Sequence, residues 1–403
     1  MLTSVELFAG AGGLGMGMSL AGFGHLAVIE WDRWACDTIR ENQRRGHPLV
    51  ADWPLTEGDV RNFDYEGMEI PVDVVVGGPP CQPFSICGKH QAHLDRRDMF
   101  PAMVGVVRRL RPRAFIVENV KGLTRESFAS YFAYITLQFE FPEVVARDGE
   151  AWESHLQRLQ REKTSGARDG LTYNVVSQLL NAADFGVPQK RERVFIVGFR
   201  ADLSIRWAFP RPTHSKKSLF AEKWATGAYW ERHKVPTGER GQPPEQLRAA
   251  ALAARQGNLR PTDEHKPWRT VRDALAGLPD PELCPENAQS ILDHRFQPGV
   301  KFYAGHSGSP LDLPAKTLKA GDHGVPGGEN ALVRPDGSGR YFTIRESARL
   351  QGFPDAYKFH GSWTEAMRQL GNAVPVPLGH VVGASVARRL LEWDMMAAAS
   401  YRA

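Results

Sequence analysis

Cysteine and long apolar runs are both scarce in this chain of 403 residues. Its four cysteines are too few for a disulfide scaffold, and their spacing does not form the pairs of a zinc site. We therefore expect no metal and a reducing compartment. No stretch reads as apolar for long enough to span a bilayer, and the first residues lack the basic end and apolar core of a signal peptide. These absences predict a cytoplasmic protein that does not enter the membrane.

The excess of positive over negative charge is also small, since the formal net charge is +4. Residues 201–340 contain 20 Lys and Arg against 16 Asp and Glu, so this segment carries the whole excess. A DNA-facing surface and a plain solvated basic face fit this balance equally well. The composition, 42% hydrophobic and 24% charged, is ordinary for a globular protein, and the length allows two lobes.

A glycine-rich turn stands near the start of the sequence. An expected strand over residues 3–8 is followed by AGAGGLGMG at residues 9–17 and then by a helical pattern. Glycines let a ligand approach the backbone and the N-terminus of the helix, which is typical of nucleotide-binding units. A tight turn that binds no ligand has the same pattern, so this signal alone is weak.

Acidic residues follow the next predicted strand. A strand over residues 26–29 ends at Glu30 and Trp31. In Rossmann-like units an acidic residue here meets ribose hydroxyls, and an indole beside it can stack on adenine. Asp59, on a following loop, can accept a hydrogen bond from an adenine amino group, although an Asp after Gly is also common in turns. Ordinary packing is the alternative for Trp31.

Cys81 lies in a stiff turn, GGPPCQPFS at residues 77–85, after a strand predicted over residues 71–76. The glycines and prolines end the strand and fix the direction of the thiol. Open α/β sheets bind ligands at such strand ends. A packed apolar cysteine is the alternative, but the polar neighbours Gln82 and Ser85 argue against it. The polar segment that ends at Arg97 is typical of an active-site loop that contacts phosphates, and a solvated loop also fits it.

A carboxylate and two arginines complete the candidate chemistry. Glu118 ends a strand predicted over residues 114–117, and an extended run would place Gln189, Arg191 and Arg193 on one side. Such side chains bind an anion or a base edge, or orient a carboxylate; a solvent-facing carboxylate and surface salt bridges are the alternatives. With a thiol, they suit nucleophilic catalysis, in which a covalent step divides one hard reaction into easier ones and a carboxyl group acts as a general acid.

Beyond residue 200 the sequence becomes irregular, and we expect a second lobe there. Its loops at residues 305–308 and 320–330 have polar tips that could read bases, although loops with no partner look the same. A helix is predicted from Thr343 to the GFP at residues 352–354. A turn over residues 369–375 and a closing helix over residues 376–393 follow. Residues 140–170 show no core pattern and are interpreted as a partly exposed insertion.

These motifs, in this order, resemble those of the DNA (cytosine-5)-methyltransferases of restriction-modification type. The resemblance covers nearly the whole chain. It rests on residues 7–17, PCQ at 80–82, ENV at 118–120, QxRxR at 189–193, RLQGFP at 349–354 and GN at 371–372. Two departures are small: Glu6 stands where Asp is commoner, and Met16-Gly17 stands where a bulkier residue and Gly often stand.

The resemblance implies an α/β fold: a Rossmann-like S-adenosyl-L-methionine-dependent methyltransferase domain with a mixed, mostly parallel sheet. This domain would comprise residues 1–200 and 342–403, with a smaller irregular target-recognition domain over residues 201–341. Cys81 would be the nucleophile, Glu118 and Arg193 would contact the cytosine, and Arg191 would help to hold the site. The residues implied to bind the cofactor are Phe8, Gly10, Gly12, Leu14, Glu30, Trp31, Asp59, Val60, Pro80 and Asn372. The residues implied to contact DNA are Gln82, Ser85, Arg97, Gln189, His323 and Arg334.

The implied substrate is double-stranded DNA, and the implied product of the cofactor is S-adenosyl-L-homocysteine. A monomer would suffice because one flipped base needs one site, and a cognate restriction endonuclease is an expected partner. Two other functions stay open. A transfer-RNA cytosine methyltransferase shares these motifs but usually carries a Cys-Phe-Thr tripeptide, which this sequence lacks. A catalytically silent DNA-binding paralogue would have no chemical need for Cys81, Glu118 and Arg193 together.

Overall fold

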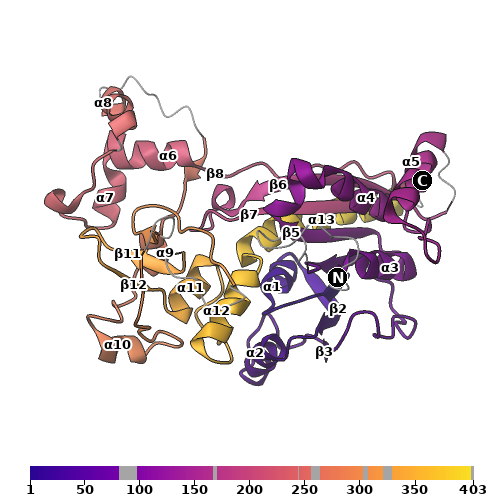
Figure 1. Cartoon of the computed structure of the whole chain (residues 1–403), viewed down its shortest axis with the longest axis horizontal. Helices are drawn as coiled ribbons and strands as arrows, with labels where there is room; N and C mark the ends of the chain where they lie inside the picture. The colour runs from indigo at the N-terminus through magenta and orange to yellow at the C-terminus, as the bar shows by residue number, and fades with distance from the viewer. Residues whose placement is uncertain are drawn as a thin grey trace. The chain divides into compact units, whose positions relative to one another are not determined.

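The computed structural model of the chain is shown in Figure 1 and describes residues 1–80, 98–166, 170–243, 245–255, 264–302, 307–320 and 329–400. The chain divides into two compact units. Unit 1 comprises Met1–Leu180, Glu192–Pro210 and Gly379–Ala403, and unit 2 comprises Asn181–Arg191 and Arg211–Leu378. These bounds differ from those of the predicted domains, because residues 342–378 belong to unit 2 and only the end of the chain returns to unit 1.

Unit 1 contains a seven-stranded sheet with the strand order β3-β2-β1-β4-β5-β7-β6. The first five strands in this order pair in parallel, whereas β7 runs antiparallel to β5. The predicted mixed, mostly parallel sheet is therefore confirmed. The strands are β1 Leu2–Leu7, β2 Phe23–Glu30, β3 Leu55–Glu57, β4 Val74–Gly77, β5 Ala114–Val120, β6 Tyr173–Asn181 and β7 Glu192–Arg200.

Side-chain alternation decides which residues of the sheet reach each face, because neighbours along a strand point to opposite sides. Val5 and Leu7 of β1 belong to the large hydrophobic cluster that β4, β5 and β7 form with α3 and α4. Ser4 and Glu6 therefore face the other way. The helices of unit 1 are α1 Gly13–Leu20, α2 Arg33–Arg44, α3 Phe100–Leu110, α4 Ala129–Glu140, α5 Trp152–Ser165 and most of α13 Val376–Ser400.

The closing helix α13 packs closely against α1. A Cβ on Gly17 would lie 2.6 Å from the carbonyl carbon of Gly379, and a Cβ on Gly383 would lie 2.8 Å from Sδ of Met18. Glycines at these positions let the two helices approach each other where a larger side chain would collide. The end of the chain is thus fixed beside the helix that follows the glycine-rich turn.

Unit 2 has little regular sheet. Strands β10, β11 and β12 form one small sheet, and β8 pairs with β9. One hydrophobic cluster contains Val271, Leu318 and Phe342, and a second contains Trp224 and Trp230. The elements are β8 His214–Ser215, α6 Lys216–Ala221, α7 Ala228–Arg232, α8 Arg248–Arg255, β9 Lys266–Pro267, α9 Val271–Leu275, α10 Pro285–Gln289, β10 Ser309–Pro310, β11 Ala331–Val333, β12 Gly339–Tyr341, α11 Ile344–Leu350 and α12 Trp363–Asn372.

Three local predictions are corrected by the structure. The turn expected over residues 369–375 is wrong, because α12 continues to Asn372. The interpretation of residues 140–170 as an insertion without a core pattern is wrong in part, since α5 forms there and buries His155 and Leu159. The short strand β3 was not predicted, because three residues carry too little periodicity. By contrast, the helix expected after Thr343 is confirmed as α11, with a capping box between Thr343 and Glu346.

One helical stretch, Trp363–Ala399, is long and apolar enough to cross a membrane by length and composition. The expectation that no stretch reaches this threshold is therefore wrong. The stretch is interrupted between α12 and α13, and 72% of its most apolar window is buried within the protein. Such burial is typical of a core helix.

Candidate active site

The glycine-rich turn between β1 and α1 follows a left-handed backbone path. Phe8, Gly10 and Gly12 have φ angles of 58°, 56° and 85°, and Gly12 is the N-cap residue of α1. Positive φ is costly for a bulky residue such as Phe8 and is found most often at functional sites. A Cβ on Gly10 would meet no atom within 4 Å, so the space beside the turn is open.

Glu30, at the end of β2, connects the turn to the next loop. Its buried carboxylate accepts hydrogen bonds from the backbone N–H groups of Gly10 at 2.7 Å, Trp31 at 2.8 Å and Asp32 at 2.7 Å. Burial raises the pKa of Glu30, and these three hydrogen bonds oppose that rise. A carboxylate has about four lone-pair sites, so Glu30 can still accept a hydroxyl group.

The other predicted cofactor residues differ in their exposure. The Trp31 side chain is 72% exposed, so one ring face is available for stacking. Asp59 accepts from Arg61 Nε at 3.0 Å, and this pairing lowers the pKa of Asp59. Its accepting capacity is thus shared with a guanidinium group. Leu14 and Val60 are buried, and the Val60 carbonyl accepts from the Tyr65 hydroxyl at 2.7 Å.

These observations fit an adenosine-containing ligand in unit 1. The open space beside Gly10 leaves room for a group that contacts the backbone. The exposed indole of Trp31 can stack on a purine, and the carboxylate of Glu30 can accept from a ribose. Pro80 is exposed. Asn372, also predicted to bind the cofactor, is an exposed residue at the end of α12 in unit 2.

Glu118 and Arg193 form an ion pair at the ends of two neighbouring strands. Arg193 Nε lies 2.9 Å from Glu118 Oε1, and the two side chains are only 11% and 9% exposed. β5 and β7 bring them together, because Glu118 pairs with Phe195 and Val120 pairs with Arg193 in the antiparallel register. Burial lowers the pKa of Arg193, and the charge of Glu118 opposes that shift. The predicted convergence of this carboxylate and this arginine is thus present.

The turn that leads to Cys81 is held against the same strand end. The side-chain amide of Asn119 donates to the carbonyl of Pro79 at 3.0 Å. A Cβ on Gly78 would lie 3.1 Å from Oε2 of Glu118, so the backbone approaches the carboxylate closely. Sequence reasoning assigned no role to Asn119 or Gly78, although both stand inside the quoted motifs. Cys81, Gln82, Ser85 and Arg97 lie outside the described residues, and so does His323.

Gln189 and Arg191 are interior residues of unit 2. The Gln189 amide donates to the carbonyl of Leu350 at 3.3 Å and accepts from the N–H of Leu318 at 3.0 Å. Arg191 donates to the carbonyls of Leu318 at 3.1 Å and Gly371 at 2.7 Å. Both side chains have no exposed surface. The DNA contact of Gln189 stays a prediction, and its amide is hydrogen-bonded inside the unit. Arg191 holds three segments together in the same way and belongs to the framework.

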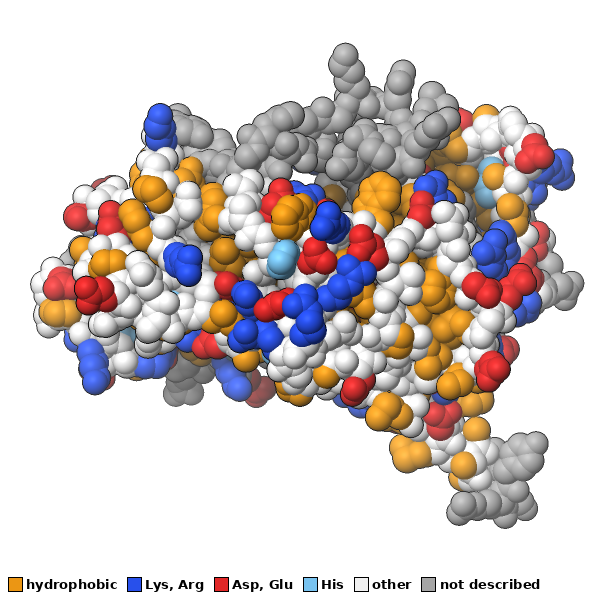
Figure 2. Space-filling view, turned by 90° about the horizontal axis from the view of Figure 1, so that it is seen from below, with side chains coloured by type: hydrophobic (Ala, Val, Ile, Leu, Met, Phe, Trp, Pro, Cys, Tyr) orange, Lys and Arg blue, Asp and Glu red, His pale blue; other side chains and the backbone are white. Residues whose placement is uncertain are grey.

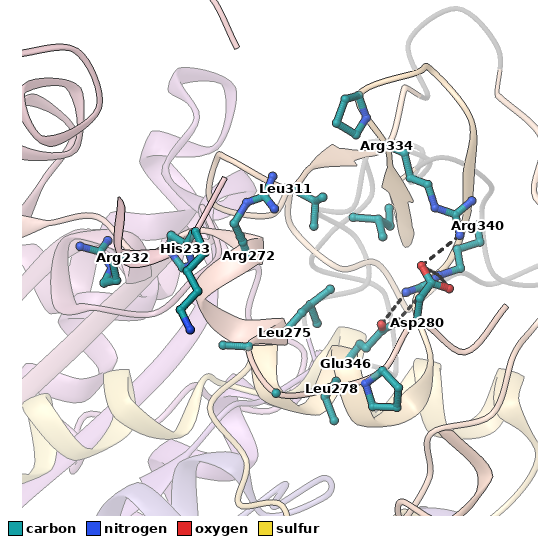
Figure 3. Close-up of a pocket in the computed structure, with 16 residues that line it drawn as sticks. Arg232, His233, Arg272, Leu275, Leu278, Asp280, Leu311, Arg334, Arg340 and Glu346 are labelled. Atoms are coloured by element: carbon teal, nitrogen blue, oxygen red, sulfur yellow. Dashed lines mark hydrogen bonds and ion pairs between the residues drawn. The ribbon is translucent and has the colours of Figure 1, made fainter. Parts of the chain in front are cut away.

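Arg334, predicted to contact DNA, is also engaged within unit 2. Its Nη2 donates to Asp280 Oδ2 at 3.0 Å and to Glu282 Oε2 at 2.7 Å. Figure 3 shows it beside Arg340, whose guanidinium binds Glu346 at 2.7 Å on both oxygens. Asp280, Arg334, Arg340 and Glu346 line a cavity of about 720 Å³ in unit 2. Carboxylates bind both of these arginines.

Basic and acidic side chains are interspersed more widely on the surface. Figure 2 shows Lys and Arg side chains that gather beside Asp and Glu on the face it presents.

Within the described ranges, no group of three or more His, Cys, Asp or Glu side chains could hold a metal ion. Of the cysteines in these ranges, Cys36 is buried and Cys284 is exposed.

The chain is similar to known proteins over almost its whole length. The family model for C-5 cytosine-specific DNA methylases matches residues 2–142 and 163–388. The Type II methyltransferase M.NgoMIV of Neisseria gonorrhoeae is 29% identical, over 96% of this chain and 98% of the relative. The Type II methyltransferase M.XorII of Xanthomonas oryzae pv. oryzae is 30% identical, over 96% of this chain and 84% of the relative.

A solved structure of a methyltransferase encoded within an E. coli prophage shares the fold. Its TM-score is 0.59 at 20% identity, and the match covers 97% of this chain and 100% of that chain. The fold and the family model together identify an α/β methyltransferase. The chain belongs to the C-5 cytosine-specific DNA methylase family and is a DNA cytosine-5 methyltransferase.

Proposed function

We propose that this enzyme flips a target cytosine out of duplex DNA and methylates its carbon 5, with Cys81 as the nucleophile. The observation that carries this proposal is the Glu118–Arg193 pair beside the turn that leads into Cys81. A thiol that follows Pro80 would start next to a fixed carboxyl group. That is the arrangement a pyrimidine needs when carbon 6 is attacked and nitrogen 3 accepts a proton.

Each residue of the pair has a separate role in this proposal. Arg193 binds Oε1 of Glu118 and leaves Oε2 on the side of Gly78. The carboxyl group can then meet the nitrogen 3 edge of the flipped base, and the remaining N–H groups of Arg193 can donate to its exocyclic oxygen. Low exposure of both side chains keeps competing water away and strengthens these contacts. Gly78 and Asn119 act as positioning residues, since they set the distance between the turn and β5.

We propose that unit 1 binds S-adenosyl-L-methionine at the glycine-rich turn. The cofactor supplies the methyl group when it is bound. Gly10 leaves room for the ligand to approach the backbone, Glu30 accepts a ribose hydroxyl and Trp31 stacks on the adenine. Phe8, Gly12, Leu14, Asp59, Val60, Pro80 and Asn372 stay predicted neighbours of the cofactor.

Target recognition is assigned to residues 201–341, which carry the positive excess. DNA contacts are proposed for Gln82, Ser85 and Arg97 near the nucleophile and for His323 in the second lobe. The burial of Gln189 and the pairing of Arg334 support other roles for those two residues. A restriction-modification role, with a cognate endonuclease as partner, follows from the similarity to Type II methyltransferases. The protein is proposed to act as a monomer in the cytoplasm.

The proposal is tested with a duplex library of many sequences and S-adenosyl-L-methionine that carries a labelled methyl group. The products are sequenced for 5-methylcytosine. Marks at one short motif would support the reaction and identify the target together. Incorporation into transfer RNA but not into DNA would favour the transfer-RNA enzyme. Cofactor binding and DNA binding without any incorporation would favour a silent paralogue.

A further inference from the structure

A group of polar side chains lies buried beneath α1, and the proposed chemistry does not use it. Ser4 and Glu6 come from β1, and His25 comes from β2. Strand alternation points Ser4 and Glu6 away from the cluster that α3 and α4 cover. The side chains of Glu6 and His25 are each 1% exposed. Buried polar groups are costly unless they make hydrogen bonds, so their partners indicate what they do.

The partners of this group converge on one residue, Gly15 in the first turn of α1. The carboxyl group of Glu6 lies directly against Gly15, where Oε2 occupies the place that a Cβ would need. The carbonyl of Gly15 lies 3.2 Å from Nε2 of His25. A carbonyl can only accept, so Nε2 carries the proton, and Nδ1 then accepts from the hydroxyl of Ser4 at 3.1 Å. Glu6 and His25 therefore contact the same residue, Glu6 by packing against it and His25 through its carbonyl group.

The space around Gly15 is filled by the same side chains. A Cβ on Gly15 would lie 2.0 Å from Oε2 of Glu6 and 2.7 Å from Cη2 of Trp53. Trp53 packs edge-on against His25 with ring centroids 4.8 Å apart, and its Nε1 donates to Ser19 Oγ at 3.2 Å. Any larger residue at position 15 would push α1 away from the sheet. The close fit is specific to glycine.

We propose that Glu6 and His25 form a clamp on Gly15 that positions the glycine-rich turn for cofactor binding. Glu6 acts here as a positioning residue, because it lies under the helix and not beside the open space at Gly10. Gly12, the N-cap residue, is three positions before Gly15, so a fixed first turn of α1 fixes the left-handed path of the turn. This inference rests on the proposed cofactor site.

The clamp depends on the protonation of Glu6. Oε2 of Glu6 is buried without a hydrogen-bond partner, so an ionised carboxylate would be poorly compensated there. Burial, and to a smaller extent the negative charge of Glu30, raise the pKa of Glu6 to about 8. Burial lowers the pKa of His25 to about 4, so this ring is neutral and supplies no positive charge. Trp53 and the backbone of α1, which also face Glu6, carry no charge.

The test measures the affinity for S-adenosyl-L-methionine by calorimetry between about pH 7 and pH 9, with wild type and Glu6→Gln. If only the protonated form of Glu6 positions the turn, the wild-type Kd rises about tenfold over this range, because the competent fraction falls about tenfold. Gln is neutral and has the same size as Glu. Its Kd should stay within about twofold across the range. Glu140→Gln, which removes a surface carboxylate paired with Lys163, should show the wild-type rise.

Hydrogen exchange of residues 9–20 without cofactor gives an independent readout. Exchange in wild type, corrected for intrinsic rates, should accelerate above about pH 8 and stay slow in Glu6→Gln. If Glu6→Gln does not fold, the affinity and exchange of wild type across the pH series still test whether the protonation of Glu6 positions the turn. A flat wild-type series in both measurements, or the same slope in Glu6→Gln, would overturn the clamp. A wild type that shows the exchange change but never binds the cofactor would overturn the cofactor proposal and leave the clamp standing.

Discussion

Arg193 Nε lies 2.9 Å from Oε1 of Glu118, across the antiparallel pairing of β5 with β7. In a parallel pair, the last residues of β5 would lie beside the last residues of the neighbouring strand. The antiparallel β7 instead brings its first residues there, so Arg193, the second residue of the strand, lies beside the end of β5. The QxRxR segment thereby supplies one arginine to unit 1 and another, Arg191, to the interior of unit 2.

The first prediction concerns the loss of Arg193. Arg193→Gln removes the charge that faces a buried carboxylate, and leaving one member of a buried pair alone costs about 3 kcal/mol of unfolding free energy. We expect kcat to fall by about 100-fold, because the carboxyl group loses its orientation. Denaturant unfolding and single-turnover kinetics measure the two effects. Arg193→Lys should recover part of the stability but little of kcat, since an ammonium lacks the planar fork.

The second prediction concerns Gly78. Gly78→Ala places a methyl group about 3.1 Å from Oε2 of Glu118, so the carboxyl group must shift by a few tenths of an ångström. A shift of this kind should lower kcat about tenfold and leave the affinity for the cofactor unchanged. Gly105→Ala is the matched control, because its Cβ would meet nothing within 4 Å in α3. That control should keep full activity and gain about 1 kcal/mol of stability.

The third prediction concerns the thiols. Cys81→Ser should abolish methyl transfer and keep cofactor binding, because a hydroxyl group is a far weaker nucleophile than a thiolate. The rate of methyl transfer to DNA and the Kd of the cofactor report these effects separately. Cys284→Ser, at an exposed position in unit 2, should behave as wild type. Retained turnover in Cys81→Ser would remove this residue from the mechanism.

Sequence patterns predicted the sheet of unit 1 well, because buried strands such as β4 and β5 are short β-branched runs that end in turns. Period-two alternation also predicted that Gln189, Arg191 and Arg193 share a side. It could not tell whether that side is the surface or the interior. Gln189 and Arg191 are buried because Leu318, Leu350 and Gly371, far away in the sequence, supply their partners.

Long-range pairing also explains the surroundings of Arg334. This residue is predicted to contact DNA, and Asp280 and Glu282 bind its guanidinium from more than 50 positions away. The composition shows the excess of positive charge, but it does not show which arginines are already paired with carboxylates. The clamp on Gly15 was missed for the same reason. Glu6 was seen only as a departure from the commoner Asp, and His25 carried no signal until β1 and β2 lay side by side.

The fourth prediction tests the role of Arg191. Arg191→Ala leaves two buried carbonyl groups without a donor, which should cost about 3 kcal/mol of stability. We expect kcat and the KM for DNA at low temperature to stay within about twofold of wild type, because the side chain acts in the framework. Thermal unfolding and steady-state kinetics give the two readouts. Lys190→Ala, at the exposed neighbouring position, is the control and should change neither. A large loss of kcat without loss of stability would restore Arg191 to the catalytic set.

The last prediction concerns the pH dependence of stability. The pKa of Glu6 is raised from 4.5 to about 8 in the folded state, so its contribution is full below pH 4.5 and is lost as pH rises through 8. The pKa of His25 is lowered from 6.5 to about 4, so its contribution is present above pH 6.5 and is lost as pH falls toward 4. The two slopes have opposite signs and cancel between pH 4.5 and 6.5.

Only the Glu6 slope remains between pH 6.5 and 8. We expect the unfolding free energy of wild type to fall by about 2 kcal/mol over this window, since one pKa unit corresponds to about 1.4 kcal/mol. Glu6→Gln should remove this slope, so the difference between the two proteins isolates the carboxyl group from all other titrations. Denaturant unfolding at a series of pH values measures it. A difference between wild type and Glu6→Gln that stays flat from pH 6.5 to 8 would mean that Glu6 is already ionised in the folded protein, because a carboxyl group whose pKa is not raised does not titrate in this window.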